Sequence, residues 1–141
     1  MNTLYSTVVT ATGGRKGKVR SDDGLLVLDL AMPRSLGGKG GATNPEQLFA
    51  AGYAACFGNA VIHVARKKDR AIRDEDVEVA ANVGLMPNDS GGFALAVALD
   101  VTLTGVDQAT AEAIVDEAHQ VCPYSNATRG IVDVALSVKT R

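Results

Sequence analysis

The sequence predicts an α+β protein in which a largely antiparallel sheet packs on one long buried helix. The stretch from Asn44 to Ala65 is apolar on nearly every face of a helix, whereas residues 76–85 and 93–103 alternate between polar and apolar side chains, as strands do. Strands and helices are partly segregated, in the order β-β-β-α-β-β-α-β. No repeat or linker divides the 141 residues, so we expect one domain over 1–141.

The N-terminal part of the chain is predicted to form three short strands. They are expected at residues 4–12, 18–20 and 25–30. Gly13 and Gly14 interrupt the first strand, which places Arg15 on a turn or at the start of the next strand. Asp22, Asp23 and Gly24 predict a second turn before the third strand.

A glycine-rich stretch follows these strands. Residues 33–43 contain SLGGKGG, which is superficially similar to a phosphate-binding loop. Such a loop needs Ser or Thr directly after its lysine, whereas Gly40 follows Lys39. We therefore interpret residues 33–43 as an irregular, mobile connection to the next helix and not as a nucleotide site.

The long central helix has a well-marked start. Asn44 can cap it, Pro45 suits its first position, and Gln47 lies three residues after the cap. Its end coincides with the basic run RKKDR, which suits a helix C-terminus. A helix that is apolar on every face is normally buried on all sides. Asn59 and His63 interrupt the apolar run, and its small residues suit a protein interior, so a membrane span is not expected.

The two alternating segments are predicted to form a hairpin closed by PNDSGG, with the long helix covering its apolar face. The second of these strands is expected to point a row of apolar side chains inward: Phe93, Leu95, Val97, Leu99, Val101 and Leu103.

A second helix is predicted from Thr104 or Asp107 to Cys122. Its buried stripe is expected to consist of Ile114, Ala118 and Val121. Because the residue before a proline avoids helical geometry, Pro123 should end this helix and PYSNATRG should form a turn. Residues 132–138 alternate again and predict a final strand.

Composition narrows the function classes. The net charge of −2 predicts no strong attraction to nucleic acid. The N-terminus lacks the apolar segment of a secretory signal, so a cytoplasmic location is expected. Cys56 and Cys122 are too far apart for a CxxC motif or for paired zinc ligands, and no His, Cys and Asp cluster predicts a metal site.

The two cysteines are the residues with the most distinctive chemistry. Cys56 alone could be a small core residue, since free cysteine is often buried. If the fold brings Cys56 and Cys122 together, they form a redox pair. Peroxide reduction by such a pair requires a thiolate, a cation that favours the thiolate and the leaving alkoxide, and a second thiol that traps the sulfenic acid. Since nucleophilicity falls with thiol pKa, the cation must act mainly on the transition state.

Two segments carry a family resemblance. TNPEQLFAAGYAACF (Thr43–Phe57) and CPYSNATRG (Cys122–Gly130) resemble the two signature segments of the organic hydroperoxide resistance proteins, a branch of the OsmC-like superfamily. ATGGR (Ala11–Arg15) is similar to a third, weaker segment, and the order of strands and helices agrees over the whole chain. CPYSNATRG separates this branch from its OsmC sister branch. One departure is Ile131, where a polar Asn is expected, and it concerns the local turn at most.

The resemblance implies a thiol-dependent peroxidase that reduces organic and fatty-acid hydroperoxides, with no metal, haem or flavin cofactor. It implies that Cys56 is the peroxidatic thiol and Cys122 the resolving thiol. Arg15 is then the guanidinium that activates the thiolate and the peroxide. Glu46 is expected to orient Arg15 through a bidentate ion pair, the geometry that Arg favours.

The resemblance also implies an intertwined homodimer with sites at the subunit interface, re-reduced by a dithiol such as the lipoyl group of a partner protein. Neither nucleic acid nor a membrane is an expected partner. Glu46 and Cys56 are ten residues apart on the predicted helix, which is about 15 Å along its axis and on different faces. We therefore predict that Arg15 and Glu46 of one subunit act on Cys56 of the other.

Aromatic residues flank Cys56 on the predicted helix: Phe49, Tyr53 and Phe57. They predict an apolar approach to the thiol and a preference for bulky alkyl hydroperoxides. Two other functions stay open, an OsmC-type peroxidase with a different peroxide preference and a non-catalytic dimeric module that binds an apolar ligand beneath the central helix. His63 and His119 are predicted to be structural, because His63 lies about two helical turns from Cys56.

Overall fold

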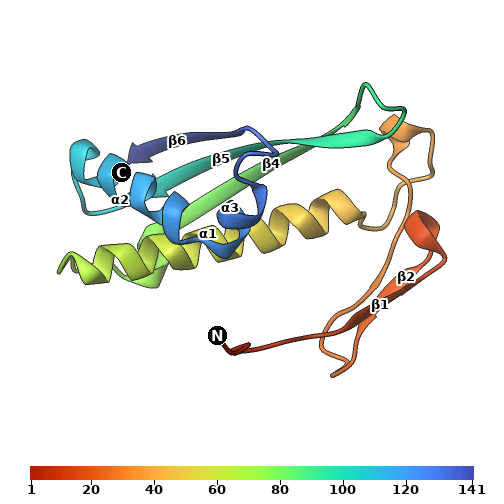
Figure 1. Cartoon of the computed structure of the whole chain (residues 1–141), viewed down its shortest axis with the longest axis horizontal. Coiled ribbons are helices and arrows are strands. Elements are labelled where there is room, and N and C mark those ends of the chain that lie inside the picture. The colour runs from red at the N-terminus through yellow and green to blue at the C-terminus, as the bar shows by residue number, and fades with distance from the viewer. The chain divides into compact units, whose positions relative to one another are not determined.

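The computed structural model describes residues 1–141 and has the α+β architecture that the sequence predicts. It contains two three-stranded sheets, ordered β1-β2-β3 and β4-β5-β6. The chain forms two compact units, Met1–Leu48 and Phe49–Arg141 (Figure 1). One domain over 1–141 stays a prediction.

The first unit is built on an antiparallel sheet of β1 (Val9–Thr12), β2 (Lys18–Ser21) and β3 (Val27–Asp29). The first strand is shorter than expected, because residues 4–8 lie outside the β1–β2 ladder. A 3-10 turn, η1 (Gly14–Lys16), joins β1 to β2. Gly13 and Gly14 have φ values of 84° and 60°, which side-chain-bearing residues rarely adopt, and this turn carries Arg15.

The first unit leaves much apolar side-chain surface uncovered. Every residue of β1 and of β3 is exposed. The exposed large apolar residues of this unit include Leu4, Tyr5, Val8, Val9, Leu25, Leu26, Val27 and Leu28. Apolar patches of this kind are typical of surfaces that another polypeptide covers.

The central helix α1 (Pro45–Lys67) begins as predicted, because the Asn44 side chain accepts a hydrogen bond of 2.9 Å from the backbone N–H of Gln47. Within the chain only one face of α1 is buried, through Tyr53, Phe57, Ala60, Val61, Val64 and Ala65. The predicted burial of α1 on all sides is therefore not achieved within one chain. By length and composition α1 could cross a membrane, and this buried face packs it into a protein core instead.

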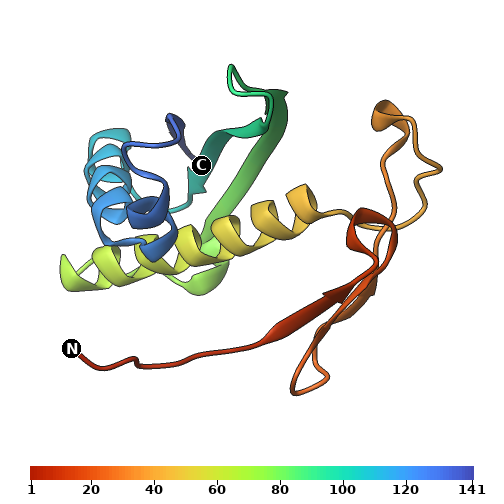
Figure 2. The ribbon, with the colours of Figure 1, turned by 45° about the vertical axis from the view of Figure 1, so that its right-hand side comes forward.

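The second unit pairs the hairpin of β4 (Val77–Pro87) and β5 (Phe93–Leu103) with β6 (Val134–Thr140). The β4–β5 pairing is antiparallel and the β5–β6 pairing is parallel. Two helices, α2 (Gln108–Val121) and α3 (Pro123–Thr128), connect β5 to β6. Figures 1 and 2 show α1 and α2 on the same side of this sheet. The buried core contains residues of α1, β5 and α2, among them Val61, Leu99 and Ile114.

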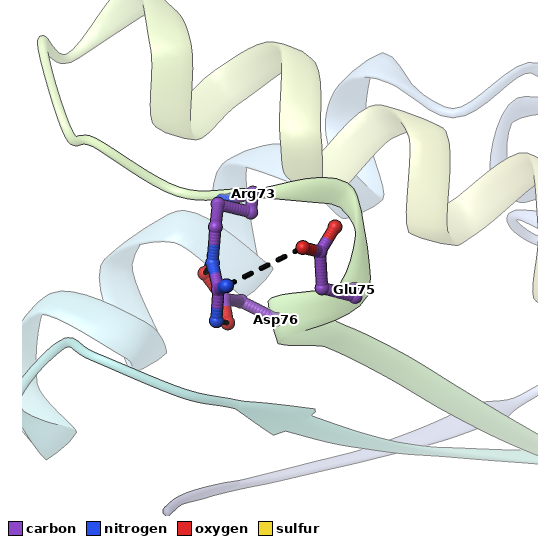
Figure 3. A network of polar contacts seen from close by, with 3 residues as sticks. All are labelled: Arg73, Glu75 and Asp76. Carbon is purple, nitrogen blue, oxygen red and sulfur yellow. Dashed lines mark hydrogen bonds and ion pairs between the residues drawn. The ribbon is translucent and has the colours of Figure 1, made fainter.

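A small polar network fixes the return of the chain from α1 to β4 (Figure 3). The Arg73 guanidinium donates hydrogen bonds of 3.1 and 2.8 Å to the two carboxylate oxygens of Asp76, and it lies 3.4 Å from Glu75. The hydrogen bonds from Arg73 lower the pKa of Asp76. The carbonyl of Asp76 in turn accepts from the backbone N–H of Thr104, which ties the start of β4 to the end of β5.

Three further details differ from the sequence-based predictions. Phe93 is 72% exposed rather than inward, because it pairs with Pro87 next to the hairpin turn, away from the buried part of β5. Val121 is 42% exposed, and Ala111 and Val115 complete the buried stripe of α2 in its place. PYSNATRG contains the helix α3 rather than a simple turn, because Pro123 occupies the first position of a new helix.

Candidate active site

Cys56 and Cys122 both lie in the second unit, on α1 and at the junction of α2 and α3. Cys56 lies in the middle of α1 and is half-buried. Cys122 is fully buried at the junction of α2 and α3. Its N–H donates to the carbonyl of Ala118 and its carbonyl accepts from the N–H of Asn126, at 2.8 and 2.9 Å. The backbone of Cys122 is therefore fixed on both sides.

The two sulfur atoms are 3.6 Å apart, although the cysteines are 66 positions apart in the chain. Both cysteines are free thiols in this structure, and the Cys122 thiol donates toward the Cys56 sulfur. A disulfide requires a sulfur separation of about 2.05 Å. A closure of this size needs only a small local adjustment, so the geometry suits a reversible thiol–disulfide pair.

The electrostatics within the second unit do not by themselves activate Cys56. Burial, first of all, raises the pKa of the Cys56 thiol, and the neighbouring Cys122 raises it further. A hydrogen bond from the backbone of Tyr124 acts in the opposite direction. Since the thiolate is the nucleophile, a reactive Cys56 requires a cation in addition to these neighbours.

Arg15 and Glu46 form the second predicted pair, and both lie in the first unit. The guanidinium donates two hydrogen bonds, 2.7 Å to Oε1 and 3.1 Å to Oε2 of Glu46, in the predicted bidentate geometry. The hydrogen bond to Glu46 raises the pKa of Arg15, so the guanidinium stays charged. The Arg15 side chain is 36% exposed, so part of the cation remains open for a ligand.

A buried polar chain next to the cysteines was not predicted from the sequence. The Tyr53 hydroxyl lies 2.8 Å from Ser125 Oγ and 3.2 Å from Thr128 Oγ1. His119 Nδ1 lies 2.8 Å from the same Ser125 Oγ. The available signal was Ser125 and Thr128 inside the signature CPYSNATRG, but their partner on α1 lies more than 70 positions away.

The side chains around Cys56 differ in part from the predicted apolar approach. Tyr53 and Phe57 are fully buried in the core and line no approach from solvent. Tyr124 is 42% exposed, and its ring lies 5.8 Å from that of Tyr53. Gly52 makes room for this ring, because an added Cβ would lie 3.0 Å from the Tyr124 hydroxyl. Of the residues around the thiol, Tyr124 and the half-buried Phe49 therefore remain for apolar contact.

The described hollow of the first unit contains none of the predicted site residues, and no cluster of metal-binding side chains is present. A hollow of about 550 Å³ in the first unit is lined by Lys16, Lys39, Met32 and neighbouring residues, and by none of the four predicted site residues. No group of three or more His, Cys, Asp and Glu side chains is arranged to hold a metal ion.

Comparison with known proteins identifies relatives over nearly the whole chain. The model of the OsmC-like protein family matches residues 38–137. The organic hydroperoxide resistance protein OhrB of Bacillus subtilis is 49% identical over 137 residues, which cover 96% of this chain and 98% of the relative. The organic hydroperoxide resistance protein of Xanthomonas axonopodis pv. citri is also 49% identical, over 96% of this chain and 94% of its own.

The solved structures agree with this assignment. The crystal structure of an organic hydroperoxide resistance protein from Legionella pneumophila matches with a TM-score of 0.93 and 58% identity, over 98% of this chain and 99% of that chain. The residues matched by the family model, 38–137, include both signature segments, Thr43–Phe57 and Cys122–Gly130. The protein therefore belongs to the OsmC-like family, and within it to the branch of the organic hydroperoxide resistance proteins.

Proposed function

We propose that this protein is a thiol-dependent peroxidase that reduces organic hydroperoxides to alcohols as part of the defence against oxidative stress. The observation that carries the proposal is the pair of free thiols, whose sulfurs lie 3.6 Å apart with one half-buried and the other fully buried. The names of the relatives support the substrate class, since they are organic hydroperoxide resistance proteins.

The first step is oxidation of Cys56. Its thiolate attacks the outer oxygen of the hydroperoxide, the O–O bond breaks, and Cys56 becomes a sulfenic acid. The alkoxide takes up a proton and leaves as the alcohol. Cys56 suits this role because it is the more exposed of the two thiols. Arg15 supplies the cation, which stabilises the thiolate and the negative charge that develops on the leaving oxygen.

The second step closes the disulfide. The Cys122 sulfur attacks the Cys56 sulfur, the S–O bond breaks, and hydroxide leaves with the thiol proton as water. This step traps the sulfenic acid before a second peroxide converts it to sulfinic acid. The short separation of the sulfurs supports this role, because two thiols held this close in one chain react without a second molecular encounter.

A dithiol returns the protein to its reduced form. One thiolate of the reductant attacks Cys56, the more exposed sulfur, and displaces Cys122 as a thiol. The second thiol of the reductant then attacks the first reductant sulfur in this mixed disulfide, which breaks its bond to Cys56, releases the Cys56 thiol and leaves the reductant as a disulfide. We propose a lipoyl group of a partner protein as this dithiol. Turnover with lipoamide, thioredoxin and glutathione systems, measured side by side, tests this choice, and faster turnover with thioredoxin or glutathione rejects it.

We propose that the working unit is a homodimer in which Arg15 and Glu46 of one subunit serve Cys56 of the other. The uncovered apolar residues of β1 and β3 support association with a second copy. The Vibrio cholerae relative, 53% identical with a TM-score of 0.93, holds captopril in one of its active sites, so more than one active site is present in that structure.

Substitution of each cysteine tests the proposed roles. Cys56→Ser is expected to abolish peroxide reduction. Cys122→Ser is expected to permit one round of Cys56 oxidation and then to leave Cys56 open to sulfinic acid or mixed disulfides. The measurements are steady-state turnover with a dithiol and mass spectrometry after one turnover. Dithiol-dependent turnover by Cys56→Ser refutes the assignment.

Peroxide preference separates the proposal from its closest rival. A peroxidase with an apolar approach should favour a bulky alkyl hydroperoxide over hydrogen peroxide by about one to two orders of magnitude, because each buried methylene contributes about 0.8 kcal/mol. Equal catalytic efficiency for both peroxides favours the OsmC-type activity. A non-catalytic binding module would consume neither.

A further inference from the structure

Two contacts join α1 to the segment that carries Cys122, and they have matching spacing. Tyr53 and Cys56 are three residues apart on α1, and they contact Ser125 and Cys122, which are also three residues apart. Helix positions i and i+3 lie on the same face, so the hydroxyl contact and the sulfur contact are neighbouring links between the same two segments.

The hydroxyl link belongs to a chain of hydrogen bonds with one consistent proton order. The Thr128 hydroxyl donates its only proton to the carbonyl of Ser125, at 3.2 Å. It can therefore only accept from Tyr53, and the Tyr53 hydroxyl must then accept from Ser125. The Ser125 hydroxyl has then used its proton as well, so its contact with His119 requires a proton on Nδ1 of the imidazole.

The hydrogen-bonded side chains are fully buried where they connect α1 to α3. Tyr53 and Ser125 are both 0% exposed, and no buried side-chain nitrogen or oxygen of the protein lacks a partner. Removal of one hydroxyl would leave a buried polar neighbour without its partner. An unsatisfied buried group destabilises the protein by more than the loss of an exposed hydrogen bond does. Burial also lowers the pKa of His119, which favours its neutral form with a single ring proton.

We propose that His119, Ser125, Tyr53 and Thr128 are positioning residues that hold α3 against α1, so that the Cys122 sulfur captures the Cys56 sulfenic acid before a second peroxide does. This inference rests on the proposed function. None of the four hydroxyl or imidazole groups takes part in bond making. Their effect is on the resolving step, which is intramolecular, whereas over-oxidation requires a further peroxide and increases with its concentration.

The test compares two nearly isosteric variants with a matched control. Tyr53→Phe and Thr128→Val each remove one hydroxyl and keep the shape of the side chain. Ser137→Ala is the control, because its hydroxyl bonds Asp100 on the β5–β6 ladder. Thr128→Ser restores the hydroxyl and should restore wild-type behaviour.

Two quantities are measured for each variant: the rate of the first Cys56 oxidation, and the alkyl hydroperoxide concentration at which half of Cys56 becomes sulfinic acid. We expect Tyr53→Phe and Thr128→Val to lower that concentration about three- to tenfold, the factor that one net hydrogen bond represents. The rate of the first oxidation should stay within about twofold of wild type, because the hydrogen-bonded residues affect only the resolving step that follows.

The outcomes separate this inference from the function on which it rests. If the wild type forms the disulfide and both variants over-oxidise at the same concentration as Ser137→Ala, the inference is refuted and the function stands. If the rate of the first oxidation falls together with the over-oxidising concentration, the four residues are merely structural and the inference is also refuted. A wild type whose Cys56 no alkyl hydroperoxide oxidises refutes the function and the inference with it.

The proton order provides a second measurement that needs no activity. Nitrogen NMR of labelled wild-type protein should find the His119 proton on Nδ1, and Ser125→Ala should change this signal. A neutral imidazole with its proton on Nε2 would contradict the proton order and with it the continuous chain.

Discussion

Arg15 and Glu46 combine good hydrogen-bond geometry with substantial exposure. This combination suits a pair that orients a functional group and contributes little to the free energy of unfolding. Their two hydrogen bonds measure 2.7 and 3.1 Å, while the Arg15 side chain is 36% exposed. Exposed ion pairs contribute only about 0–1 kcal/mol to folding. Orientation of the guanidinium, in contrast, is what a developing negative charge in the active site requires.

The first prediction is that Glu46→Gln lowers kcat/KM for an alkyl hydroperoxide at least about tenfold. The reason is that Arg15 loses the bidentate carboxylate that fixes the orientation of its guanidinium. The free energy of unfolding should change by less than about 1 kcal/mol. Asp74→Asn is the matched control, since it removes the carboxylate of the exposed Arg66 pair and should change neither quantity. A loss of stability in Glu46→Gln that accounts for its loss of activity would contradict the orienting role.

The second prediction concerns pH and Cys56. Burial and Cys122 raise the pKa of Cys56 within its own unit, whereas Arg15 should lower it in the assembled site. The thiolate fraction grows as pH rises through the thiol pKa, so the pH at which alkylation accelerates reports that pKa. In a Cys122→Ser background, Arg15→Ala should move this rise to higher pH, and the neighbouring Lys16→Ala should not. Superimposed profiles would exclude Arg15 as the activating cation.

At the scale of elements, the turn that carries Arg15 depends on a close backbone approach. A Cβ added at Gly17 would overlap the carbonyl oxygen of Thr12 and lie 2.8 Å from the Cα of Gly13. Gly17→Ala should therefore open the junction of β1 and β2, expose it to proteolysis and reduce kcat/KM more than tenfold. Gly14→Asn is the control for cleavage, because Gly14 faces open space at φ 60°, a conformation that Asn tolerates. Equal protease resistance in the two variants would count against this account of the turn.

The elements also separate what the sequence predicts from what needs the fold. The capped start of α1 and the β4–β5 hairpin follow from local signals at Asn44 and in PNDSGG, and both were predicted. The helix α3 was missed because Pro123 can either end one helix or begin another, and only packing decides between these. Phe93 continues the inward alternation of β5, but the strand extends past the core there.

The candidate site was predictable only as far as its signature segments reach. Cys56, Cys122, Arg15 and Glu46 lie within or next to them, and the ion pair between Arg15 and Glu46 was predicted. The link from Tyr53 to Ser125 was not, because no local pattern shows which hydroxyl meets which across the fold.

At the scale of the whole molecule, the proposed dimeric site rests on the uncovered apolar residues of the first unit and on the raised pKa of Cys56 within its own unit. We predict that a heterodimer of one Cys56→Ser chain and one Arg15→Ala chain retains about half of the wild-type activity. Arg15 of the first chain would serve Cys56 of the second, whereas a site built from one chain would leave none. An inactive heterodimer of verified composition, or a fully active monomer, would reject the two-chain site.

The most direct test of the central claim is a single-turnover experiment on the reduced wild-type protein. One equivalent of alkyl hydroperoxide is added, the alcohol is quantified, and the protein is mapped by mass spectrometry. The account predicts one alcohol for each Cys56–Cys122 disulfide formed. Alcohol formed while both thiols stay reduced, or a peroxide left unconsumed, would contradict it.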